Sequence, residues 1–156
     1  MSKKFIIDSN LLLLLVVGSA NIDYIGLHKS LRAYSIEDFI LLSELIGEAG
    51  KLILTPNTLT EASNLLDRIK GQKALTTVLD AFKAVTIGSR EEYVASAPVC
   101  IMPEFDDLGL ADSVLLSLCS KEATLLTADL DLYILALRFG FTAINFNHYR
   151  DNNRYA

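Results

Sequence analysis

The chain has 156 residues, of which 51% are hydrophobic and 21% charged, and its formal net charge is −5. This composition is typical of a folded globular protein and excludes an intrinsically disordered chain. The net negative charge argues against general binding of nucleic acid through bulk charge, so such binding requires a local basic patch or bridging cations. The length predicts a single domain over residues 1–156.

Short apolar segments alternate with segments of helical periodicity along the chain. In chain order, the pattern predicts a strand at 4–8, a helix at 11–17, a short helix at about 24–31, a helix from 36 to about 49, a strand at 51–54, helices at about 56–70 and 72–84, a short helix at 89–98, a strand or extended connection at 99–102, a helix at 108–121, a strand at 124–127, a helix at 130–139 and a strand at 142–146. This alternation indicates an α/β fold, a three-layer α/β/α sandwich around a mostly parallel central sheet of about four strands.

Local signals set several of these boundaries. Ser35 and Asp38 have the spacing of a capping box, and Thr55-Pro56 suits a helix cap and first helical position. Gly18 is expected to end the first helix, and Gly50 the helix that begins at residue 36.

The apolar N-terminal run resembles a secretion signal, but Asp8 and Asn10 interrupt it. Its uninterrupted part, residues 11–17, is far shorter than the roughly 20 residues that a membrane span needs. We therefore interpret the run as buried core and expect no association with a membrane.

Four acidic residues lie where such a fold would bring them together. Asp8 ends the first strand and Asp129 follows the strand at 124–127, and ligands of open parallel sheets bind beyond the carboxyl ends of the strands. Glu61 and Asp112 lie in helices and are flanked by small residues, which permit close approach of other elements or a ligand. Four acids at one sheet edge repel each other and require a compensating cation, for which Mg²⁺ or Mn²⁺ is the natural candidate.

Each acid taken singly also has a purely structural explanation, and the sequence leaves these explanations open. Asp8 can bond the turn that follows it, and Asp129 can cap the next helix. Asp112 can complement a helix dipole, and Glu61 can be a solvated helix residue. The occurrence of all four acids in this order makes a common site the better interpretation.

Four short motifs together resemble the PIN-domain family of nucleases. They are DSN at 8–10 after an apolar strand, TEASNL at 60–65, LADS at 110–113 and LTADLDL at 126–132. Each motif is weak alone, but their order and spacing are fairly specific. The resemblance extends from Phe5 to about Phe146.

The resemblance implies a PIN-like fold and a metal-dependent nuclease, most often acting on RNA, with Mg²⁺ or Mn²⁺ as cofactor. Asp8, Glu61, Asp112 and Asp129 match the family's acidic quartet, which binds the metal and carries catalysis. Four further residues are expected to support this site: Ser9, Asn64, Thr127 and Asp131.

The chain departs from the compact toxin-type members of the family in one respect. Asp8 and Glu61 are separated by 52 residues, so an insertion is expected at about 19–35. The polar tail at 148–156 is expected to be loosely ordered. Four basic residues are expected to guide an RNA backbone: Lys29, Arg32, Arg68 and Lys73.

The leading hypothesis is a divalent-metal-dependent endoribonuclease that acts as the toxin of a toxin–antitoxin pair, with an antitoxin protein as partner and a homodimer as its assembly. Three alternatives stay open: a non-catalytic PIN-like binding or scaffold module, a structure-specific DNA nuclease and a metal-dependent phosphatase. Cys100 and Cys119 lack metal-type spacing and are expected to be reduced thiols, which favours a cytoplasmic protein.

Overall fold

The computed structural model describes residues 3–48 and 51–154. Helices and strands alternate along most of the chain, as the sequence predicts. The elements are β1 (Lys4–Ile7), α1 (Ser9–Ala20), the 3₁₀ helices η1 (Ile22–Leu27) and η2 (Lys29–Leu31), α2 (Ile36–Ile46), β2 (Leu52–Leu54), α3 (Pro56–Leu65), α4 (Gln72–Gly88), β3 (Arg90–Glu91), α5 (Ser96–Cys100), α6 (Phe105–Leu118), β4 (Ala123–Thr127), α7 (Leu130–Arg138), β5 (Ala143–Asn145) and α8 (Phe146–Arg154).

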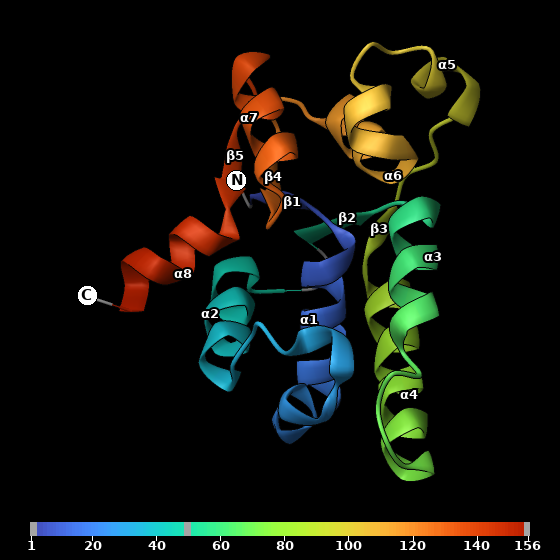
Figure 1. Ribbon diagram of the computed structural model, residues 1–156, viewed down its shortest axis with the longest axis vertical. Helices are drawn as coiled ribbons and strands as arrows, with labels where there is room; N and C mark the ends of the chain where they lie inside the picture. The colour runs from blue at the N-terminus through green and yellow to red at the C-terminus, as the bar shows by residue number, and fades with distance from the viewer. Residues whose placement is uncertain (1–2, 49–50, 155–156) are drawn as a thin grey trace.

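The centre of the fold is one parallel sheet in the order β3-β2-β1-β4-β5. Helices α6 and α7 cover one face, while α1, α2 and α4 lie on the other (Figure 1). The expected α/β/α sandwich is thus confirmed, with five strands instead of about four. Chain order reverses at β1, which lies between β2 and β4, and this makes the carboxyl ends of β1 and β4 the topological switch point of the sheet.

Strand β1 contributes to two cores because its side chains alternate between the faces of the sheet. Phe5 and Ile7 join a large core with α1, and Ile6 joins a smaller core with α6 and α7. Both faces of a central parallel strand are covered, which explains its uninterrupted apolar sequence.

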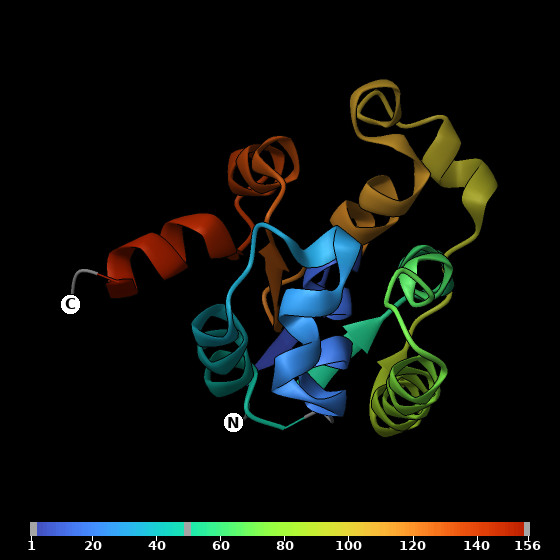
Figure 2. The same cartoon turned by 60° about the horizontal axis from the view of Figure 1, so that its bottom comes forward.

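Helix α1 is longer than expected at both ends. It begins at Ser9, capped by Asp8, and continues through Gly18 to Ala20. Gly18 therefore does not end the helix, and its function is close packing, because a Cβ atom there would overlap the ring of Phe39 on α2. Helix α1 runs through the centre of the helical layer (Figure 2), where residues 11–18 are all buried.

The capping signals at α2 and α3 are confirmed. Ser35 and Asp38 form a reciprocal capping box, and Thr55 caps α3, in which Pro56 is the first residue. Helix α2 ends at Ile46, while its expected end near Ala49 and Gly50 lies outside the described residues.

The expected helix at 89–98 is wrong. Ser89 has the residue type of a helix cap, but its hydroxyl bonds the Val85 carbonyl at the end of α4. The chain then forms the edge strand β3 and the short helix α5, with Pro98 inside α5. The segment 99–102 is likewise neither strand nor extended, because it completes α5 and turns into α6.

The tail at 148–154 is also not loosely ordered but belongs to α8. Asn145 accepts hydrogen bonds from the Asn147 and His148 amides, which starts the helix. Phe146 is fully buried, and the Arg150 guanidinium pairs with Asp38 at 2.9 Å. These tertiary contacts stabilise α8, whose polar sequence has a low intrinsic helix propensity. Within the described ranges, no helix has the length and apolarity to cross a membrane.

Candidate metal-binding active site

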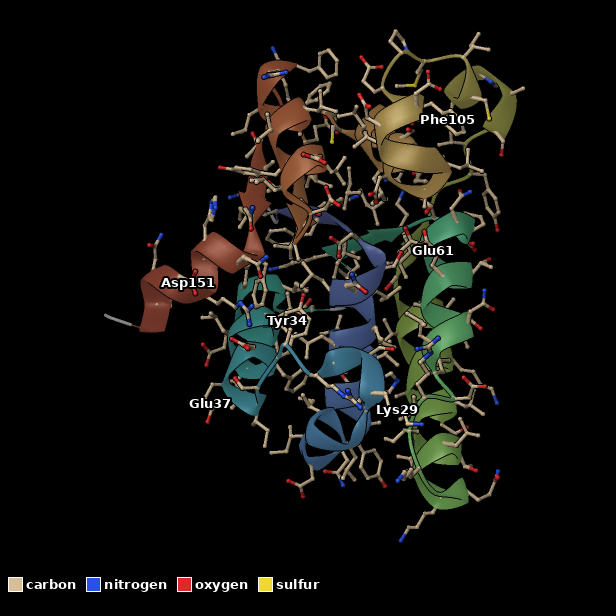
Figure 3. The ribbon with its side chains drawn as sticks, in the orientation of Figure 1. Lys29, Tyr34, Glu37, Glu61, Phe105 and Asp151 are labelled. Atoms are coloured by element: carbon tan, nitrogen blue, oxygen red, sulfur yellow. The ribbon has the colours of Figure 1, made fainter. Side chains whose placement is uncertain are left out.

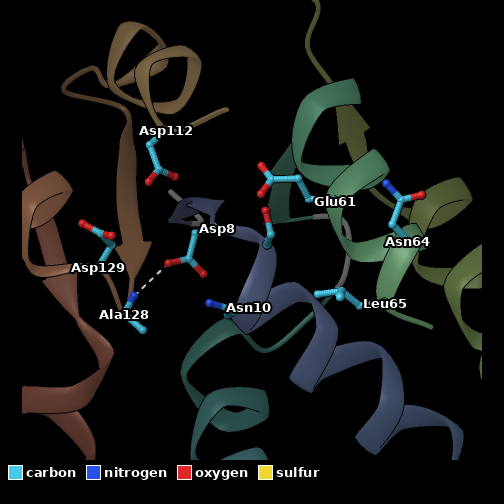
Figure 4. Close-up of a pocket in the computed structure, with 9 residues that line it drawn as sticks. Asp8, Asn10, Glu61, Asn64, Leu65, Asp112, Ala128 and Asp129 are labelled. Carbon is cyan, nitrogen blue, oxygen red and sulfur yellow. Dashed lines mark hydrogen bonds between the residues drawn. The ribbon is translucent and has the colours of Figure 1, made fainter. Parts of the chain in front are cut away.

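A cavity of about 390 Å³ lies at the switch point, beyond the carboxyl ends of β1 and β4 (Figure 4). It brings together residues from α1, α3, α6 and the turn after β4. Its lining residues are Asp8, Ser9, Asn10, Glu61, Asn64, Leu65, Asp112, Ala128 and Asp129. All four acids of the predicted quartet therefore face one cavity, although they come from four separate parts of the chain.

Asp8 is the most firmly held of the four carboxylates. Its Oδ1 accepts the Leu11 amide at 3.0 Å and caps α1, and its Oδ2 accepts the Thr127 hydroxyl at 2.6 Å and the Ala128 amide at 2.8 Å. Burial raises the pKa of Asp8, against the opposing effect of these hydrogen bonds. Asp8 is thus both a structural cap and a wall of the cavity.

The turn from Thr127 to Asp129 connects β4 to α7. Hydrogen bonds to side chains before α1, within the turn itself and on α8 hold it in place. The Thr127 hydroxyl that donates to Asp8 accepts the Asp129 amide at 2.9 Å. Asn147 of α8 donates its side-chain amide to the Ala128 carbonyl at 3.2 Å. Asp129 in turn caps α7 through Oδ1, which accepts the Leu132 amide at 2.9 Å, and its Oδ2 accepts no hydrogen bond from the described residues.

Asp112 approaches the cavity because α6 is interrupted. Gly109 adopts φ 78°, which is favourable for glycine alone, and the helix resumes with Asp112 in its first turn. The positive end of a helix favours a carboxylate there. Burial and the charges of Asp129, Asp8 and Glu61 outweigh that effect and raise the pKa of Asp112 to about 7.

Glu61 projects from α3 across the cavity toward Asp8 (Figure 4) and is exposed to solvent. Neither Glu61 nor Asp112 accepts a hydrogen bond or an ion pair from any described residue. Asn64 lines the same cavity one turn further along α3, but its amide lies on the side of the helix away from Asp8.

The donor set suits a hard divalent cation. Carboxylate oxygens are the preferred ligands of Mg²⁺ and Mn²⁺, and no Lys or Arg is among the residues that line this cavity. Among the described residues, no three His, Cys, Asp or Glu side chains converge tightly enough to hold a metal ion as they stand. Mg²⁺ does not require such convergence, because one or two carboxylates and several waters usually hold it.

The remaining predicted residues fall into three groups. Ser9 lines the cavity, and Thr127 is fully buried behind Asp8. Asp131 is not brought to the site, since it lines a separate hollow with Arg138. The basic residues do not line the cavity either: Lys29, Arg32, Arg68 and Lys73 are all exposed outside it.

Among the residues that sequence reasoning missed at the site, two have polar side chains. Asn10 lines the cavity, and its position in the DSN motif was a signal that could have identified it. Asn147 supports the turn before Asp129, but no sequence signal marked it, because the contact depends on how β5 leads into α8.

Comparison of the chain with protein-family models, curated proteins and solved structures finds no match. The chemistry of the cavity and its place in the fold are therefore the basis for assigning a function.

Proposed function

We propose that this protein is a divalent-metal-dependent endoribonuclease of the PIN-like type, which hydrolyses RNA phosphodiester bonds. The observation that carries the proposal is the gathering of four carboxylates, from four separate elements, around one cavity at the switch point of a parallel sheet. Ligands of open α/β sheets bind at this position. The motifs that resemble the PIN family supply the same four residues.

The electrostatics of the cavity support binding of a cation. Burial, and after it the charges of the three neighbouring carboxylates, raise the pKa of Asp112 to about 7, and no residue that lines the cavity neutralises those charges. An anionic phosphodiester would be repelled by this charge. A bound Mg²⁺ or Mn²⁺ ion neutralises phosphate charge and lowers the pKa of a water ligand. Asp8, Glu61, Asp112 and Asp129 are the residues that would hold it.

Residues at the cavity differ in how firmly they are held and in their protonation. Thr127 and the Ala128 amide hold Asp8 in one orientation, so no reorganisation of that carboxylate is needed when substrate binds. Asp112 gains or loses a proton near neutral pH in the metal-free protein. Glu61 is exposed and unbonded, so it is free to turn toward an ion or a water molecule.

The test is cleavage of labelled single-stranded RNA with Mn²⁺ by the native protein and by Asp112→Asn. We expect the substitution to lower kcat/KM by about 100-fold or more, because it removes a carboxylate that would hold the cation. Asp131→Asn is the matched control. It removes an acid that the motif also contains but that lies outside the cavity, and it should leave kcat/KM within about twofold of native.

Asp8→Asn should also abolish cleavage while the fold is kept, as circular dichroism can verify. Full Mn²⁺-dependent activity in both Asp8→Asn and Asp112→Asn would reject the proposal. A binding or scaffold module would show no cleavage by the native protein, and a DNA nuclease would prefer DNA in a substrate panel.

The biological setting is proposed on the PIN resemblance alone. The protein would act in the cytoplasm as the toxin of a toxin–antitoxin pair, and it would form a homodimer. Expression of the native protein should then arrest growth and Asp112→Asn should not, while sedimentation would give the oligomeric state. Growth unaffected by an active native protein would argue against the toxin assignment.

A further inference from the structure

Positive charge is concentrated in two short segments, one of which begins at the cavity-lining residue Leu65. Five of the chain's 14 basic residues lie within residues 28–32 and 65–73, although the chain as a whole carries a net charge of −5. Asp67 is the sole acid in these segments. We call the five residues the basic cluster: Lys29, Arg32, Arg68, Lys70 and Lys73.

Backbone contacts join the two segments. The Lys29 amide donates to the Arg68 carbonyl at 3.0 Å, and His28 forms an isolated antiparallel bridge with Ile69. The buried His28 ring bonds the Leu65 carbonyl through Nε2 at 2.8 Å and accepts the Ser30 amide at Nδ1. Residues 28–30 are therefore docked on the end of α3.

Leu65 connects this docking point to the cavity. Its side chain lines the cavity opposite Asn10 (Figure 4), and its carbonyl is the group that His28 bonds. Along the molecule, Glu61 lies between Phe105 of α6 and Lys29 of η2 (Figure 3). The segment 65–73 thus begins at the wall of the cavity with Leu65, and Lys29 lies on the side of Glu61 away from Phe105.

The cations of the basic cluster are available to a ligand. All five residues are exposed, and none is within ion-pair distance of a carboxylate in the described part of the chain. Exposed and unpaired lysines and arginines release counterions when they meet phosphates, which favours binding of a polyanion.

We propose that the basic cluster binds the backbone phosphates of a single-stranded RNA that flank the phosphodiester held in the cavity; this inference rests on the proposed function. A cavity of about 390 Å³ is of the size that holds a small ligand, which suits one nucleotide of a single strand. A flexible single strand can bend from the cavity past Leu65 onto the basic cluster, where positive side chains follow its backbone.

The inference predicts that the basic cluster affects cleavage of a long RNA and does not affect cleavage of a dinucleotide. Cleavage with Mn²⁺ is measured on a single-stranded RNA of about 20 nucleotides and on a dinucleotide with one phosphodiester. Lys29→Glu together with Arg68→Glu should raise KM for the longer RNA by about tenfold or more, and should flatten its log–log salt dependence by about 0.7 for each phosphate that is no longer neutralised. The dinucleotide, which does not reach the basic cluster, should be cleaved within about twofold of native.

Two further variants exclude simpler explanations. Lys121→Glu reverses an exposed lysine before the amino end of β4, at the opposite edge of the sheet, and should leave both substrates unaffected. Lys29→Gln with Arg68→Gln should give an intermediate effect on the longer RNA, and thermal melting should show that the fold is retained.

The outcomes separate this inference from the function on which it rests. Absence of cleavage of either substrate by the native protein would reject the proposed function. Native cleavage of both substrates, with an unchanged KM of the double Glu variant for the longer RNA, would reject the basic cluster as an RNA site and favour an acidic protein partner there.

Discussion

The cavity has two halves that carry the same chemical group but are built differently. The strand half consists of Asp8 and Asp129, which follow β1 and β4 and each cap the next helix. The helix half consists of Glu61 and Asp112, which project from α3 and α6 and accept no hydrogen bond from the described residues. One half is held by the protein, and the other is exposed to the electrostatic field of its neighbours.

This difference indicates how a fold stabilises part of a charged site and leaves part of it uncompensated. Hydrogen bonds to Asp8 satisfy both of its oxygens and so offset some of the cost of burial. Asp112 has no such bonds, and burial together with three neighbouring carboxylates raises its pKa to about 7. In the strand half, hydrogen bonds therefore offset part of the cost of burying a carboxylate, while the helix half has no such compensation from the described residues.

The largest difference in stability is expected between a variant that loses a carboxylate of the strand half and one that loses a carboxylate of the helix half. Asp8→Ala takes away the cap of α1 and leaves the Leu11 and Ala128 amides without acceptors, and relief of the buried charge offsets part of this destabilisation. We expect the free energy of unfolding in urea, with a chelator present, to fall by about 2 kcal/mol.

Asp112→Ala should leave the same free energy unchanged or raise it, because it removes repulsion and no hydrogen bond. Equal decreases in the two variants would show that the halves are not held differently.

A smaller effect is expected from Thr127→Val, which keeps the shape of the side chain but removes its hydroxyl. That hydroxyl donates to Asp8 and accepts from the Asp129 amide, so the substitution removes two hydrogen bonds from the strand half. The free energy of unfolding should fall by about 1–2 kcal/mol. Thr76→Val, which removes an exposed hydroxyl bonded only to a carbonyl of α4, should cost less than about 0.5 kcal/mol. Similar decreases in the two variants would show that the Thr127 hydroxyl does not stabilise the strand half specifically.

The subtlest effect is a pH dependence to which both halves contribute, through Asp112 and Asp8. Asp112 keeps its proton up to a pH of about 7 in the folded protein, whereas in the unfolded chain it ionises near its ordinary pKa of 3.8. The folded state therefore binds more protons between these values, and its stability falls as the pH rises through this window. The raised pKa of Asp8 acts in the same direction.

Denaturation in chelator at a series of pH values measures this slope. Asp112→Asn should reduce the slope, and saturating Mn²⁺ should abolish most of it in the native protein, because the ion favours the ionised carboxylates. An identical slope in native protein and Asp112→Asn would mean that burial and the neighbouring carboxylates do not raise the pKa of Asp112.

Much of the fold could be predicted from the sequence because the relevant signals are local. Apolar runs identified four of the five strands, and the capping box at Ser35 and the Thr55-Pro56 pair placed two helix starts correctly. The order of the four acids also led to residues that the structure brings around one cavity. Strand β3 was missed because a two-residue edge strand has no periodicity to detect.

The tertiary structure alone decided how each acid is held. Asp129 and Asp131 are two residues apart in one motif, yet only Asp129 reaches the cavity, because capping directs its side chain to the start of α7. Asp8 and Thr127 are 119 residues apart, and their hydrogen bond exists only once β1 and β4 are paired.

The sequence by itself thus determined the alternation of strands and helices, the buried first helix and the identity of the four acids, since periodicity and caps depend on near neighbours. Only the tertiary structure decided which acids are hydrogen-bonded, that Asn147 supports the site and that Lys29 meets Arg68. Contacts between distant parts of the chain depend on strand order and helix docking, and no local pattern encodes those.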